Sequence, residues 1–341
     1  MPLIKEDNVD SHISHIINKA LDGTLITRGE VVDLLSVEHG TIEAAAIQIA
    51  GRRLTEELCS GKAEIHGHIG LDATPCPNDC KFCSFAASAR IFRGRNEFST
   101  EEVLANARDF AQAGINAIYL VTTETYDKEK FLEMGAAVKR EVGDIPLVAN
   151  VPDFDYDYAV ELKRTGFEGC YHVIRFGEGV YTRCSVENRH KTMRAAKEAG
   201  LALGNCIDPI GPEHTPDEIA DLVMIAREYE VAFSGAMRRN TIPNSVFAEY
   251  GNIPYTRLAD YVGAVALATG TGIPGNCTHE PSPLTVQGGA NIIWAERGSS
   301  PRDVSMENTR GLDVEQCRDI YKETEWPVHE GPSRFYRKQS L

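Results

Sequence analysis

The feature that most constrains the fold of this chain is a regular alternation of short apolar segments with amphipathic ones across residues 62–295. Apolar segments of strand length recur eight times, and segments with apolar residues at helical spacing separate them. This alternation predicts a parallel sheet, and eight units predict that the sheet closes into a barrel, although an open doubly wound sheet is the alternative. The strands are expected at residues 62–71, 116–121, 145–151, 169–176, 201–207, 231–237, 272–277 and 289–295.

The segments that flank this series suggest how the chain is organised. Residues 8–59 contain three stretches with apolar residues at helical spacing, and no Pro/Gly-rich linker divides the chain. The helix expected at 99–114 begins with a capping signal, because Ser99 is followed three positions later by an acidic residue. We therefore predict an α/β protein with an N-terminal helical cap, a (βα)8 TIM-type barrel and a C-terminal extension, at residues 1–61, 62–295 and 296–341.

Three cysteines lie close together after the first expected strand, in the stretch CPNDCKFC that contains Cys76, Cys80 and Cys83. The active site of a barrel lies at the carboxyl ends of its strands, so these thiols are expected at the mouth. A structural zinc site needs four ligands, commonly in paired CxxC hooks, and the sequence has no second CxxC. Three thiolates leave one iron of a [4Fe–4S] cluster open to a ligand that is not protein.

The spacing CxxxCxΦC, with Phe82 before the last cysteine, resembles the signature of the radical S-adenosylmethionine (SAM) superfamily. The resemblance implies a [4Fe–4S] cluster on Cys76, Cys80 and Cys83 whose open iron binds SAM. It also implies cleavage of SAM to a 5′-deoxyadenosyl radical, which takes a hydrogen atom from a substrate. An electron donor such as ferredoxin or flavodoxin would then be needed. A zinc site or an incidental cysteine group is the alternative.

The same resemblance points to residues that would bind SAM after the second strand. In the superfamily a Gly-Gly-Glu-like segment there holds the methionyl ammonium. Here the expected strand runs into Thr122, Thr123 and Glu124, with threonines in place of the glycines. Glu124 therefore supplies the carboxylate of the superfamily segment. The alternative is that Glu124 is a solvated loop residue.

Further candidates follow the fourth and fifth expected strands. Ile210, Gly211 and Glu213 resemble the adenine-contacting stretch of the superfamily. Arg183 is a candidate partner of the methionyl carboxylate, with a surface arginine as the alternative. Arg175 follows the fourth strand, where a guanidinium would suit a carboxylate or another anion.

Within the superfamily, the chain resembles the biotin synthase-like branch. The cysteine loop ends in Ser88-Ala89-Arg90, and the stretch GGANIIWAE at 288–296 is similar to the last strand of biotin synthases. That branch also includes hydrogenase maturases, methylornithine synthases and archaeal-type lipoyl synthases. The resemblance therefore leaves two reactions open, which are sulfur insertion in cofactor biosynthesis and rearrangement or cleavage of a carbon skeleton.

The remaining cysteines bear on the choice between these reactions. Biotin synthase holds a second cluster on cysteines of three strands, and Tyr119, Val148 and Gly204 occupy those places here. A true biotin synthase is therefore not expected. Cys206 and Cys277, near the ends of the fifth and seventh strands, are candidates for an auxiliary iron–sulfur cluster, and small buried apolar residues are the alternative.

Composition limits the partners. Nine cysteines without a visible secretory signal favour a reducing, cytoplasmic location. A net charge of −15 disfavours nucleic acids and membrane surfaces as partners. We expect a small-molecule substrate, free or attached to a carrier, and Arg175, Arg238 and Arg239 near the mouth would suit an acidic one. A non-catalytic iron–sulfur electron carrier is the alternative of another class.

Overall fold

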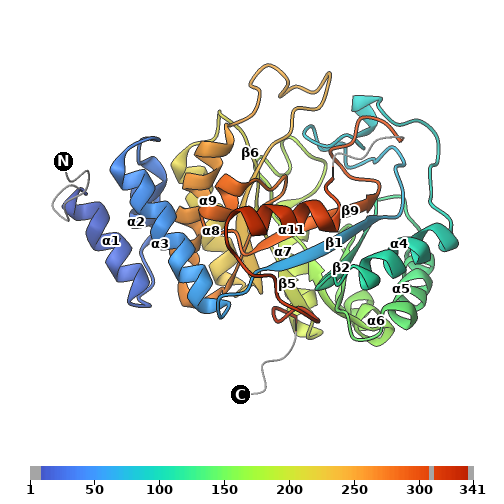
Figure 1. The fold of residues 1–341 in the computed structure, drawn as a ribbon. Helices are drawn as coiled ribbons and strands as arrows, with labels where there is room; N and C mark the ends of the chain where they lie inside the picture. Colours follow the sequence, from blue (N-terminus) through green and yellow to red (C-terminus); the bar gives the residue numbers. More distant parts are fainter. Residues whose placement is uncertain (1–8, 307–310, 337–341) are drawn as a thin grey trace.

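The computed structural model describes residues 9–306 and 311–336, and it confirms the predicted barrel (Figure 1). In these residues nine strand segments form one closed sheet with only parallel pairings, in the order β5-β4-β3-β2-β1-β9-β8-β7-β6, and β5 also pairs with β7. The segments are β1 (Glu64–Gly70), β2 (Ala117–Val121), β3 (Leu147–Asn150), β4 (Phe167–Tyr171), β5 (Ala202–Gly204), β6 (Ile207–Ile210), β7 (Phe233–Arg238), β8 (Gly275–Cys277) and β9 (Ile292–Gly298).

The strand expected at 201–207 differs from the prediction, because it is split into β5 and β6. The break lies at Asn205 and Cys206, where the Asn205 N–H donates to the Phe233 carbonyl at 3.1 Å, and the register of β6 against β7 then shifts between Ile207 and Ile210. The two pieces together occupy the place of the fifth barrel strand. The split matters for function because it brings Asp208, in β6, to the mouth of the barrel.

Helices follow the strands as the alternation predicts. Ser99 and Glu102 form the expected capping box at the start of α4. None of the described helices is long and apolar enough to cross a membrane. The barrel helices are α4 (Thr100–Gln112), α5 (Lys128–Val142), α6 (Tyr156–Thr165), α7 (Val186–Glu198), α8 (Pro216–Glu228), α9 (Tyr255–Thr269) and the short α10 (Pro283–Gln287), with 3-10 turns η2 (Ala87–Ala89) and η3 (Gly270–Gly272).

The three helices expected near the N-terminus are confirmed as α1 (Ser11–Leu21), α2 (Arg28–Ser36) and α3 (Ile42–Leu58). They stand beside the barrel, where α2 packs on α8 and α3 packs on α9 (Figure 1). Glycines let α3 and α9 approach closely, because a Cβ at Gly51 would lie 2.7 Å from the Cα of Gly263. The helices therefore support the barrel from the flank and leave its mouth open.

The C-terminal part of the chain returns to the barrel through α11 (Val314–Glu323), which packs against β1 and β9 (Figure 1). Tyr336 is buried in the barrel interior, where its hydroxyl lies 2.6 Å from that of Tyr119. Glu64 accepts a hydrogen bond from the backbone N–H of Arg334 at 2.9 Å. The division into a cap, a barrel and an extension stays a prediction, and parts of its outer segments, 1–8, 307–310 and 337–341, lie outside the described residues.

Candidate active site

A cavity of about 220 Å³ opens at the carboxyl ends of the strands, where a barrel carries its active site. The cysteine loop forms one side of it, and residues of strands β1, β2, β3, β4, β6, β7 and β9 and of loops that follow the strands, including the one after β8, form the rest. Among the described residues that line it, four are Lys or Arg and two are Asp or Glu, namely Arg175, Arg189, Arg238, Arg302, Glu124 and Asp208. The cavity is therefore more cationic than the acidic chain as a whole.

The three predicted cysteines all line this cavity, and each is partly exposed and free of a disulfide. Their loop is held by its own backbone: the N–H of Cys76 donates to Phe85 at 2.7 Å, and that of Cys83 donates to Cys80 at 2.9 Å. Burial raises the pKa of Cys76, and it raises the pKa of Cys83 to about 12. A metal must therefore displace protons from these thiols.

The chemistry of this donor set fits an iron–sulfur cluster, which proteins hold through cysteine thiolates. Three thiols from one loop face one cavity, and the rest of the cavity is left for other ligands. Within the described residues, no three Cys, His, Asp or Glu side chains are already gathered as a metal-binding group. Cys76, Cys80 and Cys83 would therefore need to reorient when a cluster binds.

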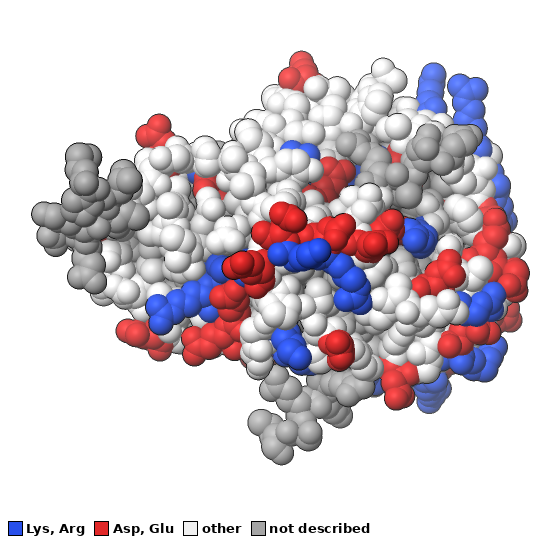
Figure 2. Space-filling model, in the orientation of Figure 1, with Lys and Arg blue, Asp and Glu red and all other residues white. Residues whose placement is uncertain are grey.

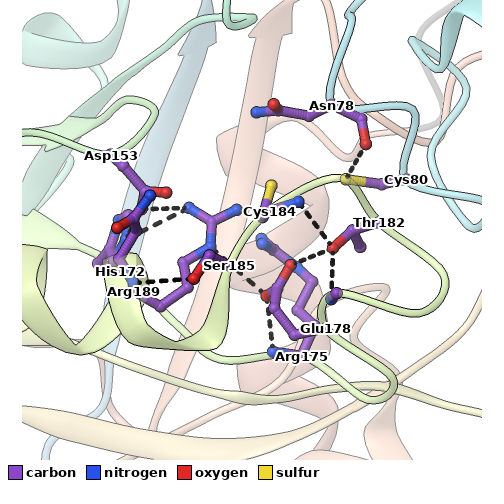
Figure 3. Close-up of polar contacts among 12 residues, drawn as sticks. Asn78, Cys80, Asp153, His172, Arg175, Glu178, Thr182, Cys184, Ser185 and Arg189 are labelled. Atoms are coloured by element: carbon purple, nitrogen blue, oxygen red, sulfur yellow. Dashed lines mark hydrogen bonds and ion pairs between the residues drawn. The ribbon is translucent and has the colours of Figure 1, made fainter.

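A fourth cysteine lies beside this loop, which the sequence did not indicate. Cys184 lies in the loop after β4, near Cys80 (Figure 3), and its thiol is the main cause that raises the pKa of Cys80. The Arg183 N–H donates to the carbonyl of Asn78 at 2.8 Å, which holds the two loops together. The side chain of Arg183 is exposed and does not line the cavity in the described structure.

Behind Cys184, a buried network ties the loop after β4 to α7 (Figure 3). Thr182 donates to Glu178 at 2.7 Å, and Arg189 lies 3.5 Å from Glu178 and 3.0 Å from Asp153. His172 also contacts Asp153, at 2.9 Å, and burial lowers the pKa of His172 to about 4. Arg189 and His172 are cavity residues that sequence reasoning missed, and only their position after a strand could have indicated them.

The segment predicted to bind the methionyl ammonium does reach the cavity. Thr122, Thr123 and Glu124 all line it, and Glu124 accepts a hydrogen bond from the Asn78 amide at 2.7 Å. Thr123 is turned toward the buried Asp72, to which its backbone N–H donates at 2.8 Å and its hydroxyl at 2.6 Å. Thr123 thus holds the segment in place, and Glu124 faces the cysteine loop.

Arg175 is also brought to the cavity. Its Nε lies 3.4 Å from Asp208 Oδ2, and both residues line the site. Burial raises the pKa of Asp208, and Arg175 opposes that shift. The buried Oδ1 of Asp208 has no hydrogen-bond partner among the described residues, so the pair keeps an acceptor for a ligand.

The adenine-contacting candidates lie away from the cavity. Ile210 is fully buried, and within the described structure neither Gly211 nor Glu213 lines the site. Glu213 instead forms a two-pronged ion pair with Arg239, one bond of which is 2.9 Å long. A Cβ at Gly211 would lie 2.3 Å from the Arg239 guanidinium, so glycine makes room for this pair. The guanidinium of Arg239 lies over the ring of Phe247. Of the two neighbouring arginines predicted near the mouth, Arg238 therefore lines the cavity and Arg239 does not, within the described structure.

Cys206 and Cys277 meet in the barrel interior below the cavity. Both are almost completely buried, and neither lines the cavity within the described structure. Burial raises the pKa of Cys277, and a hydrogen bond with Cys206 raises it further. They belong to a cluster that includes Phe233, Trp294 and Tyr336, so aromatic rings pack around the two thiols.

One wall of the cavity is polar and comes from the segment around β8 and β9, whose following loop accepts a hydrogen bond from the Ser84 N–H at the Pro301 carbonyl, at 2.8 Å. Arg302 forms ion pairs with the buried Glu296 and, at 3.9 Å, with Glu280. His279 stacks on Trp294 with ring centroids 4.4 Å apart, and burial lowers the pKa of His279 to about 4. The sequence indicated no role for Arg302, although it lies in the loop that follows the last barrel strand.

A model of the radical SAM superfamily matches residues 74–231 of this chain. Biotin synthase from Carboxydothermus hydrogenoformans is 25% identical over 232 residues, covering 65% of this chain and 70% of that protein. Biotin synthase from Desulforudis audaxviator is 25% identical over 256 residues, covering 71% and 75%.

Two solved structures share the fold. Methylornithine synthase (PylB) has a TM-score of 0.77 at 17% identity, covering 94% of this chain and 98% of that chain. The FeFe-hydrogenase maturase HydG from Carboxydothermus hydrogenoformans has a TM-score of 0.77 at 17% identity, covering 96% and 81%. Identities this low establish the architecture and carry no information about the substrate.

Proposed function

We propose that this chain is a radical SAM enzyme and that Cys76, Cys80 and Cys83 hold its [4Fe–4S] cluster; the match of the superfamily model to residues 74–231 and the cysteine spacing support the proposal. The observation that carries the proposal is that these three free thiols line one cavity at the barrel mouth. When bound, the cluster would supply the electron that cleaves SAM, and the resulting 5′-deoxyadenosyl radical would take a hydrogen atom from the substrate.

The chain's own residues would bind and orient SAM at the edge of this loop. Glu124 offers a carboxylate to the methionyl ammonium, and Thr123 keeps it there through the two bonds to Asp72. Arg175 is the guanidinium on the cavity side and suits the methionyl carboxylate better than the exposed Arg183. These assignments refine the resemblance, because they follow from which side chains face the cavity.

The substrate would occupy the remaining part of the cavity, against the polar wall that includes His279 and Arg302. Arg238 and Arg302 project into that part of the cavity, and cations outnumber acids along its lining. Asp208 adds an acceptor with an unused oxygen. This distribution supports a small, anionic substrate that also carries a hydrogen-bond donor, held in a chamber with aromatic walls.

The structure of the lower barrel favours carbon-skeleton chemistry over sulfur insertion. An auxiliary cluster on Cys206 and Cys277 would need further ligands and free space, and aromatic side chains pack around both thiols. Sulfur insertion remains the second candidate because the curated relatives are biotin synthases. Iron and acid-labile sulfide distinguish the two: a Cys206→Ala/Cys277→Ala variant should contain as much of both as wild type. A fall to a single cluster would favour sulfur insertion.

Anaerobic reconstitution tests the main proposal. The wild-type protein should bind about four irons, change its electron paramagnetic resonance spectrum when SAM is added, and release 5′-deoxyadenosine on reduction. The triple variant Cys76→Ala/Cys80→Ala/Cys83→Ala should do none of these, whereas Cys317→Ala, at a buried cysteine in α11, serves as the control. Formation of 5′-deoxyadenosine by the triple variant would refute the assignment, and a cluster that never responds to SAM would favour the electron-carrier alternative.

A further inference from the structure

The segment that begins at Cys80 carries cations and no acidic residue. Residues 80–96 contain Lys81, Arg90, Arg93 and Arg95, whereas the whole chain has 50 Asp and Glu against 35 Lys and Arg. A local excess of positive charge in a chain of net charge −15 is a departure from its composition. Surface charge of one sign concentrates partners of the opposite sign.

Two of these arginines are free of compensating charge. Arg90 and Arg93 are exposed on the loop that leads from η2 to α4, and neither forms an ion pair within the described part of the chain. Lys and Arg side chains project from the upper right edge of the molecule, where this loop lies (Figures 1 and 2). Their charge is therefore directed to solvent.

The acids that border the segment are already neutralised. Asp79 is bound by Lys81 at 2.5 Å. Glu97 is shared between Arg95 and Lys130. The positive field of Arg90 and Arg93 is therefore not cancelled by the nearest carboxylates.

An exposed apolar area adjoins these charges. The carbonyl of Tyr181 accepts a hydrogen bond from the Lys81 N–H at 2.9 Å, which places the loop after β4 against the cysteine loop. Val180 is 77% exposed and Tyr181 is 42% exposed. The ring of Tyr181 rests edge-on against Phe247, 4.9 Å away. An apolar centre with a charged rim is the usual anatomy of a protein interface.

We infer that this surface, the cluster-loop patch of Arg90, Arg93, Arg183, Val180 and Tyr181, docks an acidic electron-transfer protein. The inference rests on the proposed function, because the electron must reach a cluster held by the loop beneath the patch. A donor seated there gives up one electron and the cluster gains one, and no bond is made or broken. A long anionic polymer is the competing occupant of a basic patch, and the overall charge of −15 disfavours it.

The test compares two reductants on the reconstituted protein. One is the hydroquinone of an acidic flavodoxin, and the other is photoreduced 5-deazariboflavin, a small neutral donor that needs no docking. The variant is Arg90→Glu/Arg93→Glu. Its matched control is Arg140→Glu/Arg164→Glu, with the same charge change in the last turns of α5 and α6 at the other end of the barrel.

Electrostatic steering raises association rates by roughly 10 to 10³-fold, so reduction by flavodoxin should slow at least tenfold in Arg90→Glu/Arg93→Glu at low salt. The difference should fade near 1 M salt, where the Debye length is about 3 Å. Reduction by deazariboflavin, and both reductions in the control, should match wild type. The rate of reduction by flavodoxin in the milder Arg90→Gln/Arg93→Gln variant should lie between those of wild type and Arg90→Glu/Arg93→Glu. The affinity for oxidised flavodoxin should fall from wild type to Arg90→Gln/Arg93→Gln to Arg90→Glu/Arg93→Glu, whether or not this protein holds its cluster.

Equal flavodoxin rates in the variant and wild type would overturn the inference. So would loss of deazariboflavin-driven reduction in the variant, because the arginines would then serve the site itself. Tight, patch-dependent binding of a random DNA duplex in place of flavodoxin would also overturn it. Absence of SAM cleavage by wild type with either reductant would refute the proposed function instead, so the two failures are distinguishable.

Discussion

The bond between Thr123 and Asp72 offers the sharpest test of how the SAM-binding segment is held. Thr123→Val keeps the shape of the side chain and removes the hydroxyl that donates to Asp72 at 2.6 Å. Asp72 is buried, and the oxygen concerned then keeps only a 3.4 Å contact with the N–H of Thr74. A hydrogen bond to a charged group contributes about 1.5–3 kcal/mol, so the free energy of unfolding should fall by about that amount.

The same free energy sets the scale of the effect on SAM. If Thr123 positions Glu124, the dissociation constant of SAM should rise by roughly ten- to a hundredfold, because about 1.4 kcal/mol corresponds to a factor of ten. Urea unfolding of the protein and titration of SAM into the reconstituted protein measure the two quantities. Thr125→Val is the control, because Thr125 is exposed and its hydroxyl contacts only that of Thr123, at 3.2 Å. Equal effects of the two substitutions would refute the reasoning.

Three further outcomes are expected. Glu124→Gln should raise the dissociation constant of SAM about tenfold or more while leaving the iron content intact, since a charge-assisted bond is lost; an unchanged constant would show a loop residue without this role. Tyr336→Ala should lower the free energy of unfolding by about 3–5 kcal/mol in urea, because a buried aromatic ring leaves the barrel interior; a loss below 1 kcal/mol would contradict that packing. The pKa of His172 is 6.5 in the unfolded chain and about 4 in the fold, so the folded protein holds this side chain neutral. The free energy of unfolding should therefore decline as the pH falls from 6.5 toward 4, by on the order of 3 kcal/mol from this group. His172→Gln should flatten that decline in urea unfolding, and an unchanged pH profile would count against it.

Much of the fold follows from local sequence patterns. The alternation over 62–295 predicts the closed parallel sheet, because each strand and helix has a period that can be read without its neighbours. The capping box at Ser99 is of the same kind, since all its bonds lie within four residues. The break in the fifth strand, at Asn205 and Cys206, was not predicted, because it depends on how this segment pairs with β7.

The candidate site divides in the same way. The cysteine spacing predicted the resemblance to the radical SAM superfamily, whose model matches residues 74–231, and the face of the barrel, because the three cysteines lie within eight residues. The resemblance also led to Glu124 and Arg175, which face the cavity. It could not separate them from Arg183 and Glu213, which lie in equally plausible loops, because the direction of a side chain depends on packing by other segments.

What the sequence determined by itself is therefore the architecture and the thiols that would bind iron, since both are encoded over short distances. The tertiary structure decided which distant residues meet. It places Cys184 beside Cys80, and it brings the loop that carries Pro301 and Arg302 against Ser84 of the cysteine loop. It also brings the hydroxyl of Tyr336 to 2.6 Å from that of Tyr119. These contacts join residues more than a hundred positions apart in all three cases, and they depend on the closure of the barrel, which no local pattern records.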